Sequence, residues 1–308
     1  MPTAPPTLAM STSWRIRLTE SVPAVLDALR ELGIRRVELN GLTPAQAEGV
    51  ATELAARRMV AQSLHNPCPW PVDPSGKRLA GHITDGLACG DEHVRAQALA
   101  WARATIDLAR RLGARAVVIH LGRVELSPVQ GRLFELLRSG HRAEFADLRE
   151  RALAEREAHK EPNLRQALAS IRELGTYAAA AGVALGVEVR DGYDEIPNFR
   201  EFQQVFAATA GLPVYYWHDV GHVEKQRWLG LATQADYLVC FRKRLLGVHL
   251  HDAILDRDHL VPGQGEIDLA AVARLLPAGA LRTLELNSPP TPAEVRRGIA
   301  LLARLGLA

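Results

Sequence analysis

Histidine, aspartate and glutamate residues recur at the ends of short apolar runs along the 308-residue chain. Imidazole nitrogens and carboxylate oxygens are ligands of divalent cations, and carboxylates also transfer protons. Six successive runs end in such residues, and the set comprises His65, His120, Glu188, Asp219 with His222, His249 with His251, and Glu285. If the runs are parallel strands of one barrel, their carboxyl ends meet at one rim and these side chains gather there.

The alternation of side chains along a strand refines this set. In Val187-Glu188-Val189 the two valines share one face, so Glu188 points to the other, and His249 and Glu285 follow the same pattern. Buried carboxylates without a counter-charge are costly, and few Lys or Arg residues occur at these strand ends to pair with them. The pattern therefore predicts a divalent metal site, and nitrogen and oxygen ligands without cysteine suit Zn, Mn, Mg or Co.

The elements that must position these residues alternate between strand-like and helix-like stretches. Eight β-rich runs are expected at 14–18, 35–39, 59–65, 115–121, 184–189, 214–217, 245–251 and 281–286, and helical stretches lie between them. Several helical stretches end at a glycine just before the next run, which is a usual helix stop. Eight such units predict the α/β class and a single (β/α)8 TIM barrel. A doubly wound sheet is the alternative, but it would normally carry a glycine-rich turn after its first strand, where this chain has Thr19-Glu20-Ser21.

The chain is expected to form one domain, with a flexible N-terminal tail over residues 1–13 and the barrel over residues 14–308. One connection is much longer than the others and runs from about Gly122 to Gly182, between strands 4 and 5. Its charged middle, residues 142–160, has Ala and Leu at helical spacing and predicts a long helical insertion. The loop 66–90 is the other long connection, and Trp70 is its one bulky apolar residue.

Composition limits the classes of partner. The 37 basic and 35 acidic residues give a net charge of +2, so neither a nucleic-acid nor a membrane partner is expected. The three cysteines form no C-x-x-C pair, and the N-terminus has no signal-peptide pattern. We therefore expect a cytoplasmic protein that acts on a small molecule, and the sequence leaves open whether it forms a homo-oligomer.

With these residues in place, the chain resembles the xylose-isomerase-like TIM barrel superfamily, which holds sugar isomerases and epimerases together with the endonuclease IV group. The resemblance covers nearly the whole chain. It is carried by Ser-Leu-His-Asn-Pro at 63–67, Val-Ile-His-Leu-Gly at 118–122, His-Asp-Val-Gly-His at 218–222, His-Leu-His-Asp at 249–252, and Asp-His-Leu-Val-Pro-Gly-Gln-Gly at 258–265.

The epimerase branch implies a sugar or sugar-phosphate isomerase or epimerase. In that branch one divalent metal, Zn or Mn, would be held by Glu188, Asp219, His249 and Glu285. The resemblance further implies that Glu188 and Glu285 move a proton at the carbon beside a carbonyl. His222 is a further candidate catalytic residue. Substrate contacts are expected from Arg190, His251, Arg257 and Trp70. Two alternatives stay open: His251, adjacent to a ligand residue, could instead be a hydrogen-bonding partner behind it, and Trp70 could instead anchor its own loop.

The endonuclease IV branch implies a multi-zinc phosphodiesterase acting on DNA or on a small phosphodiester. Its three ions would be held by a larger set, which here is His65, His120, Glu188, Asp219, His222, His249, His259 and Glu285. One position departs from that branch, since Arg257 stands where the group has an Asp. The sequence therefore leaves open whether the site holds one, two or three ions. It also leaves open a catalytically inactive barrel that serves as a binding module.

Overall fold

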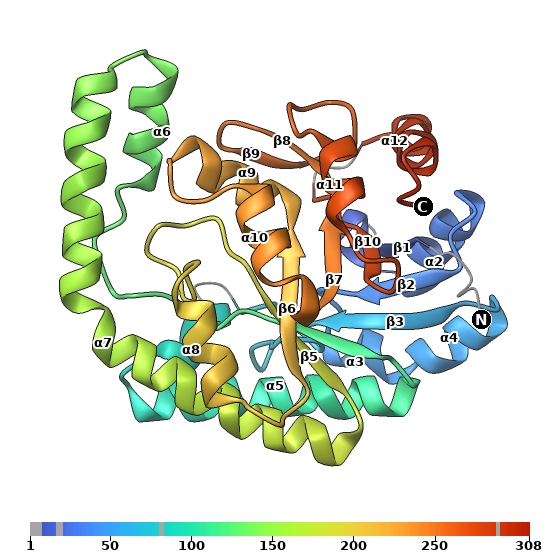
Figure 1. The fold of residues 1–308 in the computed structure, drawn as a ribbon. Coiled ribbons are helices and arrows are strands. Elements are labelled where there is room, and N and C mark those ends of the chain that lie inside the picture. Colours follow the sequence, from blue (N-terminus) through green and yellow to red (C-terminus); the bar gives the residue numbers. More distant parts are fainter. Residues whose placement is uncertain (1–7, 17–20, 80–82, 288–289) are drawn as a thin grey trace.

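The computed structural model describes residues 8–16, 21–79, 83–287 and 290–308, which form a barrel of parallel strands surrounded by helices (Figure 1). Eight strands close on themselves in the order β1-β10-β7-β6-β5-β4-β3-β2, and all neighbours are parallel. The strands are β1 (Ala9–Ser11), β2 (Arg36–Leu39), β3 (Val60–His65), β4 (Ala116–Ile119), β5 (Ala184–Glu188), β6 (Val214–Asp219), β7 (Leu245–Leu250) and β10 (Leu281–Leu284). The expected (β/α)8 barrel is confirmed, and the doubly wound alternative is excluded because the sheet is closed.

The helices form the outer layer. They are α2 (Val22–Glu31), α3 (Pro44–Glu48), α4 (Val50–Ala56), α5 (Glu92–Leu112), α6 (Gln130–Arg138), α7 (Arg142–Ala181), α8 (Glu201–Ala208), α9 (Val220–Trp228), α10 (Gln234–Cys240), α11 (Leu269–Leu275) and α12 (Pro292–Arg304). Three short 3-10 helices are η1 (Thr12–Trp14), η2 (Ile83–Ala88) and η3 (Arg242–Arg244). The expected glycine stops are confirmed at the ends of α5 and α7, where Gly113 and Gly182 adopt the left-handed conformation that favours glycine.

Within the described residues, no helix is both long enough and apolar enough to cross a bilayer.

The first strand lies earlier in the chain than expected. The sequence places it at 14–18, whereas β1 is Ala9–Ser11, and Trp14 belongs to η1. The run looks strand-like because Trp14 and Ile16 are apolar, but both are buried against the barrel from a turn. Residues 9–13 therefore belong to the barrel and not to a tail. Residues 1–7, and 17 and 18 of the expected strand, lie outside the described residues.

Trp217 is the largest side chain of a small cluster in the barrel that also contains Ala116, Val118 and Leu281. Trp217 of β6 is fully buried, and the glycines opposite it on the neighbouring strands, Gly186 and Gly247, make room for its ring. A Cβ added at Gly247 would meet the indole at 2.4 Å. The same ring lies 5.2 Å from the imidazole of His249, measured between ring centroids, so it supports that side chain from the barrel side.

The long connection between β4 and β5 is helical, as expected. It contains α6 and α7, and α6 lies beside the N-terminal half of α7 at one side of the molecule (Figure 1). The charged stretch 142–160 and the expected helix 163–181 form one 40-residue helix. Pro162 lies inside α7, which bends along its length (Figure 1), and a proline ring is a usual cause of such a bend.

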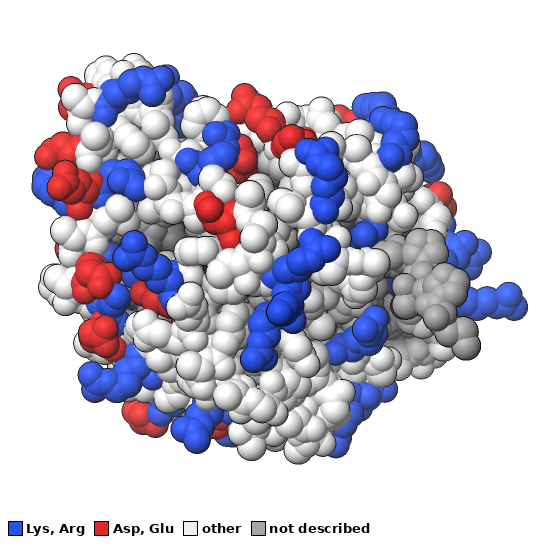
Figure 2. Space-filling view, viewed as in Figure 1, with Lys and Arg blue, Asp and Glu red and all other residues white. Residues whose placement is uncertain are grey.

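The two halves of α7 are used differently. The C-terminal half is a barrel helix, and Leu164, Ile171 and Leu174 are buried in the main core. The N-terminal half packs with α6 in a second, smaller core that includes Phe134 and Ala152. On its outer side, acidic and basic side chains are interspersed (Figure 2) and form pairs within the helix, for example Arg151 with Asp147 at 2.8 Å.

Candidate metal centre and active site

Four side chains converge at the carboxyl ends of four neighbouring strands. Glu188 ends β5, Asp219 ends β6, His249 lies on β7, and Glu285 follows β10 directly. Their ligand atoms lie within 4.8 Å of one another, and all four side chains are buried. Each is an inward residue of an alternating strand, which is why one rim collects them. We refer to these four residues as the quartet.

Two further groups of ligand-type atoms flank the quartet and share a residue with it. His65 and His120 lie with Glu188, and His222 and His259 lie with Asp219. His65 ends β3 and His120 follows β4, so both come from strands next to β5 or one strand away. His222 belongs to the first turn of α9, where the Asp219 carboxylate caps the helix by accepting from the His222 backbone N–H. The structure therefore brings together all eight residues that the sequence nominated as ligands.

A two-stranded hairpin, which the sequence analysis did not predict, carries His259. It consists of β8 (Asp252–Ile254) and β9 (Arg257–Leu260). His259 has a φ of 55°, which interrupts the alternation of β9, so Asp258 and His259 both line the cavity. Arg257 is exposed and does not line it. The structure therefore places Arg257, which was expected to contact substrate, outside this cavity.

Asp258 brings a carboxylate to the group formed by Asp219, His222 and His259, whereas Arg257 does not. Oδ2 of Asp258 lies 3.9 Å from Nε2 of His222, and its Oδ1 lies 3.1 Å from Nδ1 of His259. This group therefore has a further carboxylate. It comes from position 258, one residue after position 257, where the endonuclease IV group has its Asp.

The carboxylates of the quartet find their counter-charge in histidines. Among the described residues, the ion pairs of Glu188, Asp219 and Glu285 are made with imidazoles and with neither Lys nor Arg. Nδ1 of His249 lies 2.9 Å from Oε1 of Glu188, 3.5 Å from Oδ2 of Asp219 and 3.0 Å from Oε2 of Glu285. One ring nitrogen is thus surrounded by three carboxylates.

The pKa shifts follow from this arrangement. Burial by itself raises the pKa of Glu188, but His249 and His120 outweigh it and hold this pKa well below its usual value. Burial also raises the pKa values of Asp219 and Glu285, and their imidazole neighbours again bring both well below the usual range. Burial lowers the pKa of His249, yet the surrounding carboxylates raise it well above 6.5. Without an ion the three carboxylates thus favour a positive charge at this ring, and a bound cation would supply that charge and leave the imidazole neutral.

A divalent cation fits this donor set. The quartet offers three carboxylates and one imidazole without cysteine, a combination typical of Zn²⁺ or Mn²⁺ sites. In addition, burial and the nearby Arg190 lower the pKa of His120 to about 3, so this imidazole is neutral at neutral pH, as a metal-binding imidazole must be.

A buried carboxylate, Glu38, lies behind the quartet and was not predicted from the sequence. Glu38 of β2 is fully buried, accepts from the Ser63 hydroxyl at 2.9 Å, and lies 3.1 Å from Nε2 of His249. This contact orients the ring so that Nδ1 faces the quartet, as carboxylates behind metal-binding histidines commonly do. The signal was present in the sequence, because Glu38 lies between Val37 and Leu39 just as Glu188 lies between two valines.

The substitution Glu38→Gln is expected to weaken binding of Mn²⁺ or Zn²⁺ by about 10–100-fold, because an uncharged amide no longer fixes the orientation of the His249 ring. Titration of the metal against a chelating indicator measures this affinity. Glu224→Gln is the matched control, since Glu224 is an equally buried glutamate that pairs with Arg227 outside the site. An affinity within twofold of the unsubstituted chain would contradict the positioning role of Glu38.

His251 lies behind the site and not in it. The sequence left open a substrate contact or a hydrogen-bonding partner behind a ligand, and the side chain is fully buried and does not line the cavity. Its Nε2 lies 2.9 Å from Oδ1 of Asp219, and its Nδ1 accepts from the His259 backbone N–H at 2.8 Å. His251 therefore orients Asp219 and the β9 hairpin.

A cavity of about 360 Å³ opens above these groups. Glu188, Glu285 and the flanking histidines form part of its wall, and the predicted residues Trp70 and Arg190 also line it. Further polar residues that the sequence analysis did not select complete the lining: Ser13, Asn40, Asn66, Asp191, Lys225 and Asn287. The cavity is thus a polar space over a set of carboxylates and imidazoles, with one indole wall.

Arg190 and Lys225 bring positive charge to one side of the cavity. Nη1 of Arg190 lies 3.2 Å from Nε2 of His120, while its Nε donates to Glu195 at 3.1 Å. Nζ of Lys225 lies 2.5 Å from Asp191 and 3.3 Å from Asp258. Both cations are therefore held by carboxylates of the loop after β5 and of the hairpin, and not by the quartet.

The sequence was compared with models of known protein families. The family model described as "Xylose isomerase-like TIM barrel" matches residues 26–305, which is most of the chain. The chain belongs to this family. Comparison with curated protein sequences finds no match.

Solved structures of xylose isomerase-like barrels resemble the chain over its whole length. An L-ribulose 3-epimerase has 17% sequence identity and a TM-score of 0.68, with 99% of this chain and 95% of that chain covered. A 3-keto-D-glucoside 4-epimerase from E. coli has 14% identity and a TM-score of 0.69, with 97% and 99% covered. A D-psicose 3-epimerase solved in the presence of D-fructose has 11% identity and a TM-score of 0.69, with 98% and 100% covered. At these identities the likeness shows the shared fold.

Proposed function

We propose that this protein is a divalent-metal-dependent sugar or sugar-phosphate isomerase or epimerase. The observation that carries the proposal is the quartet, in which two glutamates flank one candidate metal position at the floor of an open polar cavity. The similarity in fold to solved ketose 3-epimerases is in keeping with this activity. Glu188, Asp219, His249 and Glu285 would hold the ion.

The chemistry would be proton transfer at the carbon beside a carbonyl. A divalent ion held by the quartet would stabilise the negative charge that develops on the substrate oxygens. Glu188 and Glu285 lie on either side of Nδ1 of His249, at 2.9 and 3.0 Å, and both line the cavity. One carboxylate can therefore remove a proton while the other returns one from the opposite side. His222, also in the cavity wall, is placed to hold a substrate hydroxyl.

The rest of the cavity suits a polyhydroxylated substrate. The Asn40 amide donates to Oε1 of Glu285 at 3.1 Å, which fixes that carboxylate from the cavity side. Asn66 and Asn287 supply further amide groups, and Trp70 supplies an apolar surface against which a sugar carbon chain can lie. Arg190 would contact the hydroxyl or phosphate group farthest from the ion.

The test of this activity is exchange of a carbon-bound proton. Ketoses and ketose phosphates are incubated in D₂O with the protein and Mn²⁺, Co²⁺ or Zn²⁺, and NMR measures deuterium incorporation beside the carbonyl. We expect incorporation with at least one substrate and its loss in Glu285→Gln. Absence of exchange with every ketose, together with cleavage of a phosphodiester, would contradict the proposal.

A second candidate function, a multi-zinc phosphodiesterase, is favoured by one specific observation. The groups His65–His120–Glu188 and Asp219–His222–His259 give room for two more ions beside the quartet, and Asp258 adds a carboxylate to the second group. In this case the substrate would be a small phosphodiester that lies across the three positions, with Arg190 and Lys225 facing the phosphate.

Metal content separates the two candidates. The isomerase or epimerase is expected to retain about one Mn or Co per chain after mild purification, whereas the phosphodiesterase is expected to retain two or three Zn. Removal of the metal with a chelator is expected to lower the melting temperature, because bound ion stabilises the folded state by mass action. Elemental analysis and a thermal melt measure both quantities. A chain without metal whose melting temperature does not respond to a chelator would contradict both functions.

A further inference from the structure

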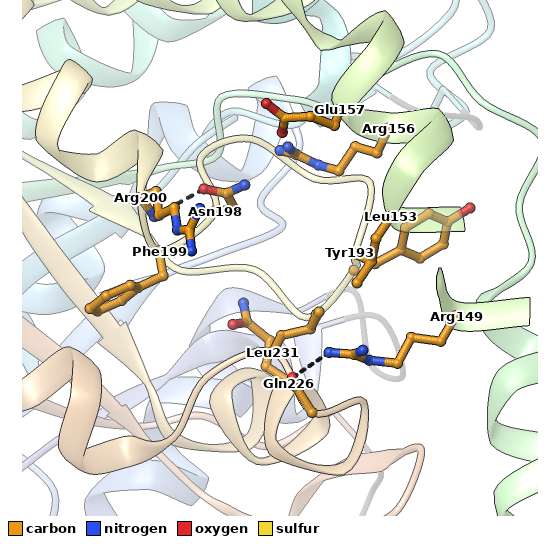
Figure 3. Close-up of a pocket in the computed structure, with 12 residues that line it drawn as sticks. Arg149, Leu153, Arg156, Glu157, Tyr193, Asn198, Phe199, Arg200, Gln226 and Leu231 are labelled. Atoms are coloured by element: carbon orange, nitrogen blue, oxygen red, sulfur yellow. Dashed lines mark hydrogen bonds between the residues drawn. The ribbon is translucent and has the colours of Figure 1, made fainter. Parts of the chain in front are cut away.

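A second cavity lies between the insertion and the barrel, apart from the catalytic cavity (Figure 3). It has a volume of about 280 Å³ and shares no lining residue with the catalytic cavity. Its walls come from α7, from the loop 192–200 that follows β5, and from the last turn of α9 with the residues after it. The insertion therefore creates this cavity together with two segments of the barrel.

Part of the lining is apolar. Leu153 of α7 and Leu231 contribute apolar side chains (Figure 3). The ring of Phe199 points away from the space and packs against Tyr237, with 5.0 Å between ring centroids, and Tyr193 belongs to the smaller core. Leucine side chains that line a cavity offer contact area to the apolar body of a ligand.

Two arginines bring positive charge to this lining. Arg149 donates from Nε to the Leu229 carbonyl at 2.5 Å and from Nη2 to the Gly230 carbonyl at 2.6 Å, which engages two of its five N–H donors. Arg200 is exposed at the opposite wall. Across the described residues, no carboxylate lies within 4.0 Å of either guanidinium group as an ion-pair partner. The one glutamate of the lining, Glu157, is paired with Lys160 at 2.6 Å.

A third arginine has a buried donor without a partner. Arg156 is 3% exposed and lines the same cavity. Its Nη1 and Nη2 are taken by Glu201, but its Nε–H has no hydrogen-bond partner among the described residues. This Nε–H is also closed off from the cavity, and the charge of Arg156 is neutralised by Glu201, so Arg156 forms part of the wall without offering a donor to a ligand.

We propose that this cavity is a binding site for a small organic anion with an apolar body, such as a phosphate or carboxylate ester of an aromatic group. Arg149 and Arg200 contact the anionic end, and Leu153 and Leu231 contact its apolar part. Binding does not depend on which reaction the catalytic cavity carries out.

The cavity is also connected to the catalytic site. Gln226 lines it, and its Nε2 donates to the backbone carbonyl of Arg190 at 2.5 Å. Lys225 lines the catalytic cavity and its neighbour Gln226 lines the second cavity. In the same way Arg190 lines the catalytic cavity and Tyr193, three residues later, lines the second one. A ligand in this cavity therefore contacts the two chain segments that carry Arg190 and Lys225.

Calorimetric titration with phenyl phosphate tests the site. Arg149→Gln and Arg200→Gln are each expected to weaken binding about fivefold or more, because each removes a charge-assisted hydrogen bond. Arg200 is exposed, so its substitution tests the site even if Arg149→Gln disturbs the packing of α7. Arg151→Gln is the matched control on the same helix, where Arg151 is exposed and pairs with Asp147 outside the cavity. Equal affinities in all three variants would overturn the proposal.

Two further measurements fix the location and the class of ligand. Inorganic phosphate is expected to bind at least tenfold more weakly than phenyl phosphate, since it lacks the apolar body, and equal binding would overturn the stated class. Hydrogen–deuterium exchange is expected to show protection by phenyl phosphate in residues 190–200 and 226–231. Protection confined to residues 63–66 and 285–287 would place the probe in the catalytic cavity and would also overturn the proposal. Neither readout requires the proposed isomerase activity, so a failure of that function is seen separately.

Discussion

Glu188→Gln is expected to lower turnover by about 10³-fold, within the range by which a general acid or base accelerates proton transfer. Glu188 is the one carboxylate that belongs to both the quartet and the His65 group, and its Oε2 lies 3.2 Å from Nε2 of His65. The amide keeps the size of the side chain but carries no charge and cannot exchange a proton. It also places an N–H₂ group near imidazoles that now face a carboxylate. Steady-state kinetics on the substrate found by deuterium exchange measures the loss.

The matched control for this prediction is again Glu224→Gln, which removes a buried carboxylate outside the site. We expect its turnover to stay within about twofold of the unsubstituted chain. Far-ultraviolet circular dichroism should show that both variants are folded. Unchanged turnover in Glu188→Gln would remove its acid–base role, and metal content measured on the same sample shows whether its role as a ligand remains.

The candidate ligands could be predicted from the sequence because strands and barrels impose strict geometry. The period of two along Val187-Glu188-Val189 fixes which side chain points inward, and parallel strands in a closed barrel bring every such end to one rim. Neither inference depends on the exact ends of a strand. This is why the quartet could be predicted even though several strand boundaries differ by one or two residues.

Features set by loops and by long-range packing could not be predicted in the same way. Asp258 reaches the site because His259 has a positive φ, and the sequence does not reveal that local break in the hairpin. The strand β1 has only three residues, too few for an alternation pattern, while the apolar run that follows it is buried from a turn. Strand parity therefore located inward residues, but it could not say which residues of an irregular segment face the cavity.

The source of positive charge in the site was only partly predicted. The sequence suggested that few Lys or Arg residues face the strand ends, and the quartet itself is indeed paired with histidines. Arg190 and Lys225 nonetheless enter the cavity from beyond the strand ends, held by Glu195 and Asp191. Arg190 lies only two residues after β5, but its pairing with Glu195 and that of Lys225 with Asp191 depend on the path of the loop after β5, which no spacing rule in the chain reveals.

Arg156→Met is expected to lower the free energy of unfolding by about 3–5 kcal/mol, because it leaves a buried glutamate without its cation. The side chains of Arg156 in α7 and Glu201 in α8 are 3% and 1% exposed, and they form a bidentate pair at 2.7 and 2.8 Å. Nη2 of Arg156 also donates to the Glu195 carbonyl at 2.9 Å. The pair thus fastens the insertion to the loop after β5, and urea denaturation measures its loss.

Arg151→Met is the control for this effect, since the exposed Arg151–Asp147 pair on the same helix should contribute at most about 1 kcal/mol. The double variant Arg156→Met/Glu201→Leu is expected to recover a large part of the lost stability, because it removes both buried charges together. A loss below about 1 kcal/mol in Arg156→Met would contradict an anchoring role for this pair. Because the same loop carries Arg190 into the catalytic cavity and Tyr193 into the second one, its attachment to α7 couples the insertion to both sites.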